Sequence, residues 1–256
     1  MSTDVMTKRI TETPPRLMAR MVAVCYFVLL ASGFDLFFVF GKIVVRGDAA
    51  ATATNILTHQ AIFLAGFAAA LLGVAAYLVV TALLYRLFEP VNRTVSLCAA
   101  FFSLTGCIIQ AVALVFHLAP LVVLANQAYL AGFKPEQLQA LALVFLNTYG
   151  SAYNLSLVFF GFYLLQIGYL TFRSTFLPRW LGVMVALGVG WVTFLDPPRA
   201  RALFPYVMLS SGGELLLVLW LLVKGVDEER WHAQAAAAPR PDRFLISRVR
   251  RTEYEH

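Results

Sequence analysis

The stretch NTYGSAYNLSLVFFGFYLLQIGYLTFRSTFLPRWLG, residues 147–182, decides the fold of this chain. It begins with small and polar residues, continues as an apolar run long enough to cross a lipid bilayer, and ends in a basic turn. A segment that crosses hydrocarbon must satisfy its own backbone polar groups, which a helix does. The stretch therefore predicts a transmembrane α-helix and, with it, a membrane protein built from helices.

The composition of the whole chain supports this interpretation. Of its 256 residues, 60% are hydrophobic and 13% are charged. Soluble domains are about 45–50% apolar and about 25% charged, so a soluble fold of this length could not cover its apolar side chains. The apolar residues also form repeated blocks of roughly 18 residues or more, which distinguishes membrane spans from buried core helices.

Six apolar blocks predict an all-α fold, a six-helix transmembrane bundle with short interfacial helices on its outer side. The predicted spans are 20–42, 61–85, 95–119, 148–172, 180–195 and 206–223. They make one membrane domain over residues 20–226, between a polar lead, residues 1–19, and a basic tail, residues 227–256. The first span predicts an uncleaved anchor, because its apolar run is too long for a signal peptide. The third span is expected to end at Pro120.

Two connections carry helix signals of their own. Asp48 predicts the cap of a short helix beginning at Ala49, because its side chain can accept the free amides of a first turn. Pro135 suits the first position of another helix, and the apolar residues after it fall on one face. We interpret residues 121–145 as a helical, interfacial or partly re-entrant cap. The alternative is that they extend spans three and four beyond the bilayer.

The distribution of positive charge predicts the orientation. Of the 20 Lys and Arg residues, 15 fall on the side of the two termini and five on the other side. The positive-inside rule therefore predicts that both termini lie on the cytoplasmic side of a cell membrane. The tail, with Arg248, Arg250 and Arg251, either contacts anionic lipid or is a solvated, disordered segment with a linker at residues 235–243. The basic charge is explained by topology and does not indicate a nucleic-acid partner. The oligomeric state is not predicted.

Polar side chains inside the spans are the candidate functional residues, because their burial in hydrocarbon is costly. In the predicted orientation they gather in the outer half of the membrane, with Glu214 near the midplane. We expect one outward-facing cavity roofed by residues 121–145. The candidate ligand-binding residues are Glu214, Asp35, Asn154, His117, Asn147, Gln110 and Ser211.

Glu214 is the strongest of these candidates. Ser210 and Ser211 lie about one helical turn before it, on the same face. A carboxyl group inside a membrane must either find a partner or hold its proton. Glu214 is therefore a proton carrier, a ligand anchor or a general acid/base, or else a hydrogen-bonded residue that packs helices together.

Small residues mark the predicted packing faces. A stripe on span four is formed by Asn147, Gly150, Ser151, Asn154, Gly161 and Gly168. Such a stripe indicates close helix packing, or the lining of a polar cavity at its outer end. In span five, Gly182, Ala186 and Gly190 recur every four residues, which predicts a second packing face.

Catalytic and metal-binding motifs are absent from the sequence. It contains no GxSxG, Walker A or HExxH pattern, and no Gly-rich dinucleotide loop between a strand and a helix. Cys25, Cys98 and Cys107 lie inside apolar blocks and predict small buried side chains, not a disulfide or metal site. We expect no cofactor and no metal ion, and we favour a protein that is not an enzyme.

Several stretches together resemble a known family of membrane proteins. They are GDAAATATNI at 47–56, LYRLFEPVNR at 84–93, FKPEQLQALALVFL at 133–146, FFGFYLLQIGYLTFRSTFLPRWLG at 159–182 and GELLLVLWLLVKGV at 213–226. In this order they are spread over residues 47–226 and resemble the family called domain of unknown function 4386. The resemblance implies a bacterial multi-pass membrane protein. Glu214 is the second residue of the last stretch and fits the pattern of the family there. It implies no activity, substrate or cofactor.

Three functional hypotheses follow from these patterns. The first is a non-enzymatic protein that binds a small amphiphile, a lipid or a partner in the cavity near Glu214, Asp35 and Asn154. The second is a small proton-coupled transporter that uses Glu214. The third is an intramembrane enzyme with Glu214 or Asp35 as acid/base and His117 assisting, which requires the three side chains to converge.

Overall fold

The structure is a computed structural model that describes residues 13–31, 39, 41–125, 130–187 and 212–238. Those residues form helices and contain no β-strand, which confirms the predicted all-α class for the described part of the chain. The helices are α2 (Pro15–Ala31), α3 (Ala49–Thr58), α4 (Gln60–Phe88), α5 (Arg93–Leu124), α6 (Pro135–Arg173), α7 (Arg179–Leu187) and α10 (Glu228–Ala237). One more apolar helix, Gly212–Val223, carries Glu214 and is called the Glu214 helix below.

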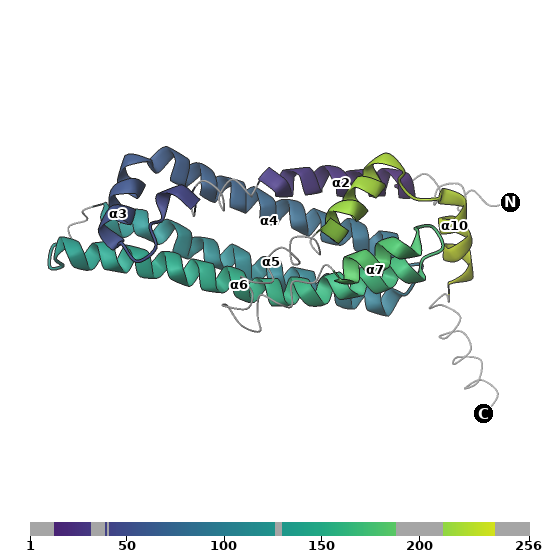
Figure 1. Ribbon diagram of the computed structural model, residues 1–256. Coiled ribbons are helices and arrows are strands. Elements are labelled where there is room, and N and C mark those ends of the chain that lie inside the picture. The colour runs from purple at the N-terminus through teal and green to yellow at the C-terminus, as the bar shows by residue number, and fades with distance from the viewer. Residues whose placement is uncertain (1–12, 32–38, 40, 126–129, 188–211, 239–256) are drawn as a thin grey trace, which may run out of the picture.

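Three helices are long and apolar enough to cross a membrane. They are α4, α5 and α6, with 29, 32 and 39 residues, and they run lengthwise beside one another (Figure 1). Their outer faces carry large exposed apolar side chains, for example Leu72, Phe101 and Val115, which are 60%, 60% and 67% exposed. Water would not solvate such faces well, whereas lipid would. The helices therefore have the character expected of a membrane protein.

The other predicted spans are described only in part. The structure shows α2, α7 and the Glu214 helix beside one half of the long bundle (Figure 1). The predicted continuations of spans one, five and six fall on residues 32–38 and 188–211, which lie outside the described residues. The described part of the chain therefore contains three helices of membrane length.

The predicted cap over residues 121–145 is wrong, and the alternative interpretation is the one observed. Helix α5 passes through Pro120 and continues to Leu124, while α6 begins at Pro135 and runs unbroken to Arg173. A proline removes one backbone donor but need not end a helix that neighbouring helices support. At the start of α6, the Lys134 amide donates to the Gln137 side-chain oxygen over 2.9 Å. Both helices are therefore longer than their predicted spans.

The short helix α3 confirms the prediction made from Asp48. The Asp48 carboxylate accepts a hydrogen bond from the Ala51 amide over 2.8 Å and caps the helix at Ala49. Ile56 of α3 is fully buried in a small core with Phe63 and Leu146. This core fixes α3 at the end of the bundle far from α10 (Figure 1).

The predicted small-residue packing is confirmed at Gly168 and Gly182. A Cβ atom on Gly168 of α6 would lie 2.8 Å from the Gly182 carbonyl oxygen, and one on Gly182 would meet the α6 backbone. On the other side of α7, a Cβ on Gly213 would overlap the Met184 carbonyl group. Helix α7 is therefore held between α6 and the Glu214 helix by backbone approaches that only glycine permits.

The first part of the tail is folded. Asp227 caps α10 by accepting a hydrogen bond from the Arg230 amide, and the Trp231 indole donates to the Leu87 carbonyl over 2.9 Å. Helix α10 lies across the end of the bundle (Figure 1). The alanine-rich segment predicted as a linker therefore belongs in part to this helix. The prediction that Arg248, Arg250 and Arg251 contact lipid concerns residues outside the described part.

Candidate functional site

Glu214 faces α2 inside the helix bundle. The Tyr26 hydroxyl of α2 donates a hydrogen bond to Glu214 Oε1 over 2.5 Å. Tyr26 is 8% exposed and belongs to the main hydrophobic core, whereas Glu214 is half-buried. A polar pair inside an apolar core is favourable only when its hydrogen bonds are made, so this contact fixes the relative positions of the two helices.

Two further tyrosines complete the surroundings of the carboxyl group. Tyr77 of α4 interacts with Glu214, and its ring packs edge-on against the rings of Tyr26 and Tyr163, at centroid distances of 6.1 and 5.9 Å. Tyr163 of α6 is 1% exposed, and its hydroxyl makes no hydrogen bond within the part of the chain that the structure describes. We call these four residues, one acid and three phenols from four helices, the tyrosine site.

A short series of polar side chains leads from the tyrosine site into the interface between α4 and α5. The hydroxyl groups of Thr81 and Ser103 are 2.6 Å apart, and Thr81 also donates to the Tyr77 carbonyl over 2.8 Å. Cys107, one turn after Ser103 on α5, interacts with Ser103 and lies near Tyr163. All three side chains are buried. Thr81 therefore places an exchangeable proton about one turn nearer the α10 end than Tyr77, whereas Ser103 and Cys107 extend the series along α5.

The members of the tyrosine site lie at one depth in the bundle. Tyr26, Tyr77, Tyr163 and Glu214 are each about nine to eleven residues from the helix end nearest α10, roughly 14–17 Å at 1.5 Å per residue. The hydrocarbon core of a bilayer is about 30 Å thick. The site is therefore about half a bilayer thickness from that end of the bundle.

His117 lies apart from the tyrosine site. Its imidazole is fully buried and packs against the rings of Phe63 and Tyr149, at centroid distances of 4.5 and 5.2 Å. On α5 it follows Cys107 by ten residues, roughly 15 Å along the helix axis. The structure therefore does not bring His117 to Glu214, and the arrangement needed by the enzyme hypothesis is not formed by these two residues. Gln110 is half-buried on α5, between Cys107 and His117.

The other sequence candidates do not join Glu214 in the described residues. Asn147 and Asn154 of α6 are exposed, and Ser151 donates to the Asn147 carbonyl of its own helix over 2.9 Å. Nothing lies within 4 Å of a Cβ built on Gly150. The outer end of the α6 stripe therefore faces away from the core, whereas its Gly168 end packs against α7. Asp35 and Ser211 lie outside the described residues.

Sequence reasoning missed the three tyrosines. Tyrosine favours the two membrane interfaces, where its ring is in lipid and its hydroxyl in water. Tyr26, Tyr77 and Tyr163 instead lie well inside the apolar blocks. A tyrosine far from both ends of a span needs a buried hydrogen-bond partner, and this signal could have linked them to Glu214. The described residues contain no group of three His, Cys, Asp or Glu side chains that could hold a metal ion.

The fold and the site define the chain first as an α-helical protein with several membrane-length apolar helices. The family model described as "Domain of unknown function (DUF4386)" matches residues 21–225, and the chain belongs to this family. All four members of the tyrosine site fall within the matched region, whereas α10 lies beyond it. The prediction from the five sequence stretches is thereby confirmed.

One similar protein comes from an archaeon. An uncharacterised protein of Archaeoglobus fulgidus is 30% identical over 83 residues, which are 31% of this chain and 50% of that protein. The chain thus spans about half the length of this relative. No solved structure matches the chain. Neither comparison assigns an activity, so a function must be argued from the site itself.

Proposed function

We propose that the chain is a six-span protein of the cell's inner membrane with both termini in the cytoplasm. The three membrane-length helices support this, together with α2, α7 and the Glu214 helix, which lie where spans one, five and six are predicted. The start of α2 is joined to the end of the Glu214 helix, since Arg16 donates to the Val226 carbonyl. The excess of Lys and Arg on this side agrees with a cytoplasmic face.

The function that the geometry supports best is the binding of a small amphiphile or lipid at the tyrosine site. A single observation carries this proposal: a carboxyl group and three phenols from four helices meet at mid-bundle depth, inside an otherwise apolar core. Ionisable residues at such depths are costly and mark sites of binding or transport. The carboxyl group would accept hydrogen bonds from, or pair with, the polar group of the ligand. The outward opening of the cavity and the part played by Asp35 stay predictions.

The Tyr163 hydroxyl supports a ligand in particular. Two of the phenols already interact with Glu214, but Tyr163 buries its hydroxyl without a hydrogen bond to any described residue. A buried polar atom left in this state costs about 1–3 kcal/mol. A ligand with a polar group between Tyr163 and Glu214 would remove that cost.

Native mass spectrometry of the full chain tests the proposal. Wild type, Glu214→Gln and Glu136→Gln are purified in mild detergent from the same cells and presented with the same lipid extract. We expect wild type and Glu136→Gln, which changes an exposed acid at the start of α6, to retain the same amphiphile. Glu214→Gln should lose it. Equal retention by all three, or no retained amphiphile in wild type, would refute the proposal.

A second candidate function, proton-coupled transport through Glu214, is favoured by the polar series Thr81, Ser103 and Cys107. These groups could pass protons between the tyrosine site and the interface of α4 and α5. Purified protein in liposomes with an internal pH-sensitive dye tests this function. Transport requires amphiphile-dependent proton uptake in wild type that is absent from Glu214→Gln. Binding of the amphiphile without any proton movement would refute the transport function and retain only the binding function.

A further inference from the structure

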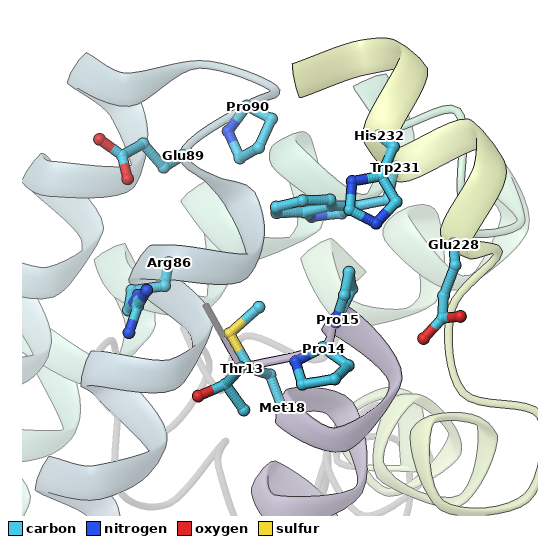
Figure 2. A pocket seen from close by; sticks show the side chains of 10 residues that line it. All are labelled: Thr13, Pro14, Pro15, Met18, Arg86, Glu89, Pro90, Glu228, Trp231 and His232. Carbon is cyan, nitrogen blue, oxygen red and sulfur yellow. The ribbon is translucent and has the colours of Figure 1, made fainter. Parts of the chain in front are cut away.

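A pocket lies at the α10 end of the bundle, far from the predicted outer surface. It has a volume of about 660 Å³, within the range of roughly 300–1,000 Å³ that small-molecule sites occupy. Figure 2 shows that three parts of the chain form it: the start of α2, the end of α4 with the turn that follows, and α10. None of its residues belongs to the tyrosine site.

The walls of this end pocket are partly apolar and rigid. Pro15 and the buried Met18 line one side. Trp231 lies opposite Arg86 and Glu89 (Figure 2). Its indole N–H donates a hydrogen bond to the Leu87 carbonyl over 2.9 Å. The ring is therefore held in place at the pocket wall, beside the His232 ring at a centroid distance of 5.1 Å. The face of an indole ring attracts organic cations.

The end pocket is lined by side chains of both charges, and only one of its acids forms an ion pair among the described residues. Glu89 forms an ion pair with Arg93 over 3.4 Å. Within the described part of the chain, Arg86 on α4 and Glu228 on α10 form no ion pair with any other residue, although both line the pocket. In Figure 2 they lie on opposite sides of it, with Trp231 between them. Among the described residues, one positive and one negative group without an ion-pair partner thus line the same pocket.

We propose that this pocket binds the zwitterionic headgroup of a membrane phospholipid, with the ammonium group against Glu228 and Trp231 and the phosphate against Arg86. The chemistry is that of a phosphodiester joined to an alkylammonium group. Arg86 is within one turn of the end of α4, where the apolar helix gives way to polar residues and where headgroups lie around a spanning helix. An anionic lipid fits less well, because Glu228 would face its negative charge. The inference rests on the proposed membrane location, but not on a ligand at Glu214.

Lipid retention by the full chain in detergent tests this inference. Native mass spectrometry compares phosphatidylethanolamine, phosphatidylcholine and phosphatidylglycerol at equal concentrations, for wild type, Glu228→Gln and Arg86→Gln. We expect wild type to retain one zwitterionic lipid in preference to phosphatidylglycerol. Each substitution should lower that retention by about fivefold, the effect of losing one partly exposed charge interaction. Glu229→Gln and Arg20→Gln, which alter exposed charges outside the pocket, should retain the lipid like wild type.

Two results of the lipid-retention experiment would overturn the inference. One is retention by Glu228→Gln equal to that by Glu229→Gln. The other is a preference for phosphatidylglycerol in wild type. Soluble phosphoethanolamine is added in a parallel experiment, because it carries the same charges without acyl chains. If it binds as tightly as the lipid, the source of the ligand is the cytoplasm and the lipid assignment is wrong. If Glu228→Gln loses the zwitterionic lipid but still retains the amphiphile at the tyrosine site, the two sites bind their ligands independently.

Discussion

Glu214 can be changed in two ways that separate folding from binding. Glutamine keeps a side-chain oxygen that accepts the Tyr26 hydrogen bond. The free energy of unfolding of Glu214→Gln should therefore stay within about 1 kcal/mol of the wild-type value, although the variant should lose the amphiphile. Leucine leaves the Tyr26 hydroxyl without its observed partner, and Glu214→Leu should cost about 1–3 kcal/mol. Unfolding curves in detergent measure both. Equal destabilisation by the two substitutions would show that the charge itself supports the fold.

Tyr163 and Tyr26 provide a matched pair of substitutions. Tyr163→Phe removes a hydroxyl that has no hydrogen bond among the described residues, so stability should stay within about 0.5 kcal/mol of wild type or rise. Tyr26→Phe removes a hydroxyl bound to Glu214 and should destabilise by about 1 kcal/mol. If the ligand contacts Tyr163, Tyr163→Phe should nevertheless reduce amphiphile retention in native mass spectra. Unchanged retention would remove Tyr163 from the binding site.

Residue-level reasoning from the sequence found the acid but not its neighbours. Glu214 was predictable because an acid in the middle of an apolar block is costly wherever the block packs. The tyrosines were not, because the meeting of Tyr26, Tyr77 and Tyr163 depends on which helices are adjacent and how each is rotated. The same limit applies to His117, which lies about 24 residues into α5. Its neighbours are the aromatic rings of Phe63 and Tyr149, and the sequence alone does not show which rings meet it.

At the scale of elements, glycine contacts position the Glu214 helix. A methyl group at Gly213 would overlap the Met184 carbonyl group, so Gly213→Ala should destabilise by about 1–3 kcal/mol through overpacking. Gly150→Ala is the control, because nothing lies within 4 Å of its Cβ position. This second change should stabilise α6 by about 0.5–1 kcal/mol, since alanine favours helix. Apparent unfolding temperatures compare the two, and effects of the same sign would contradict the packing described.

The helices themselves were largely predictable, and their ends were not. Apolar blocks and the Asp48 cap correctly indicated α3, α4 and the core of α5 and α6. Pro120 misled the prediction because a proline in a helix supported by its neighbours costs less than one in an exposed helix. The polar sequence before Thr148 looked like a connection, yet α6 continues through it from Pro135. Helix α10 was missed because its docking depends on long-range contacts, from Trp231 to Leu87 and from Gln234 to Thr175.

At the scale of the whole molecule, the orientation can be read by labelling cysteines. In a background without Cys25, Cys98 and Cys107, one variant carries Gly132→Cys, in the connection between α5 and α6, and another carries Glu229→Cys, on α10. An impermeant maleimide should label only Gly132→Cys in intact spheroplasts and both variants after lysis, because the two positions lie at opposite ends of the bundle. Labelling of Glu229→Cys in intact spheroplasts would place the α10 end outside and reverse the orientation.

The central claim is that an acid and three phenols form a polar site at the middle of a membrane bundle. An experimental structure of the full chain in lipid nanodiscs measures this most directly. The account predicts that Tyr26 Oη lies within hydrogen-bonding distance of Glu214, with Tyr77 and Tyr163 beside them, at the centre of the bilayer density. A structure in which Glu214 faces the lipid, away from all three tyrosines, would contradict it.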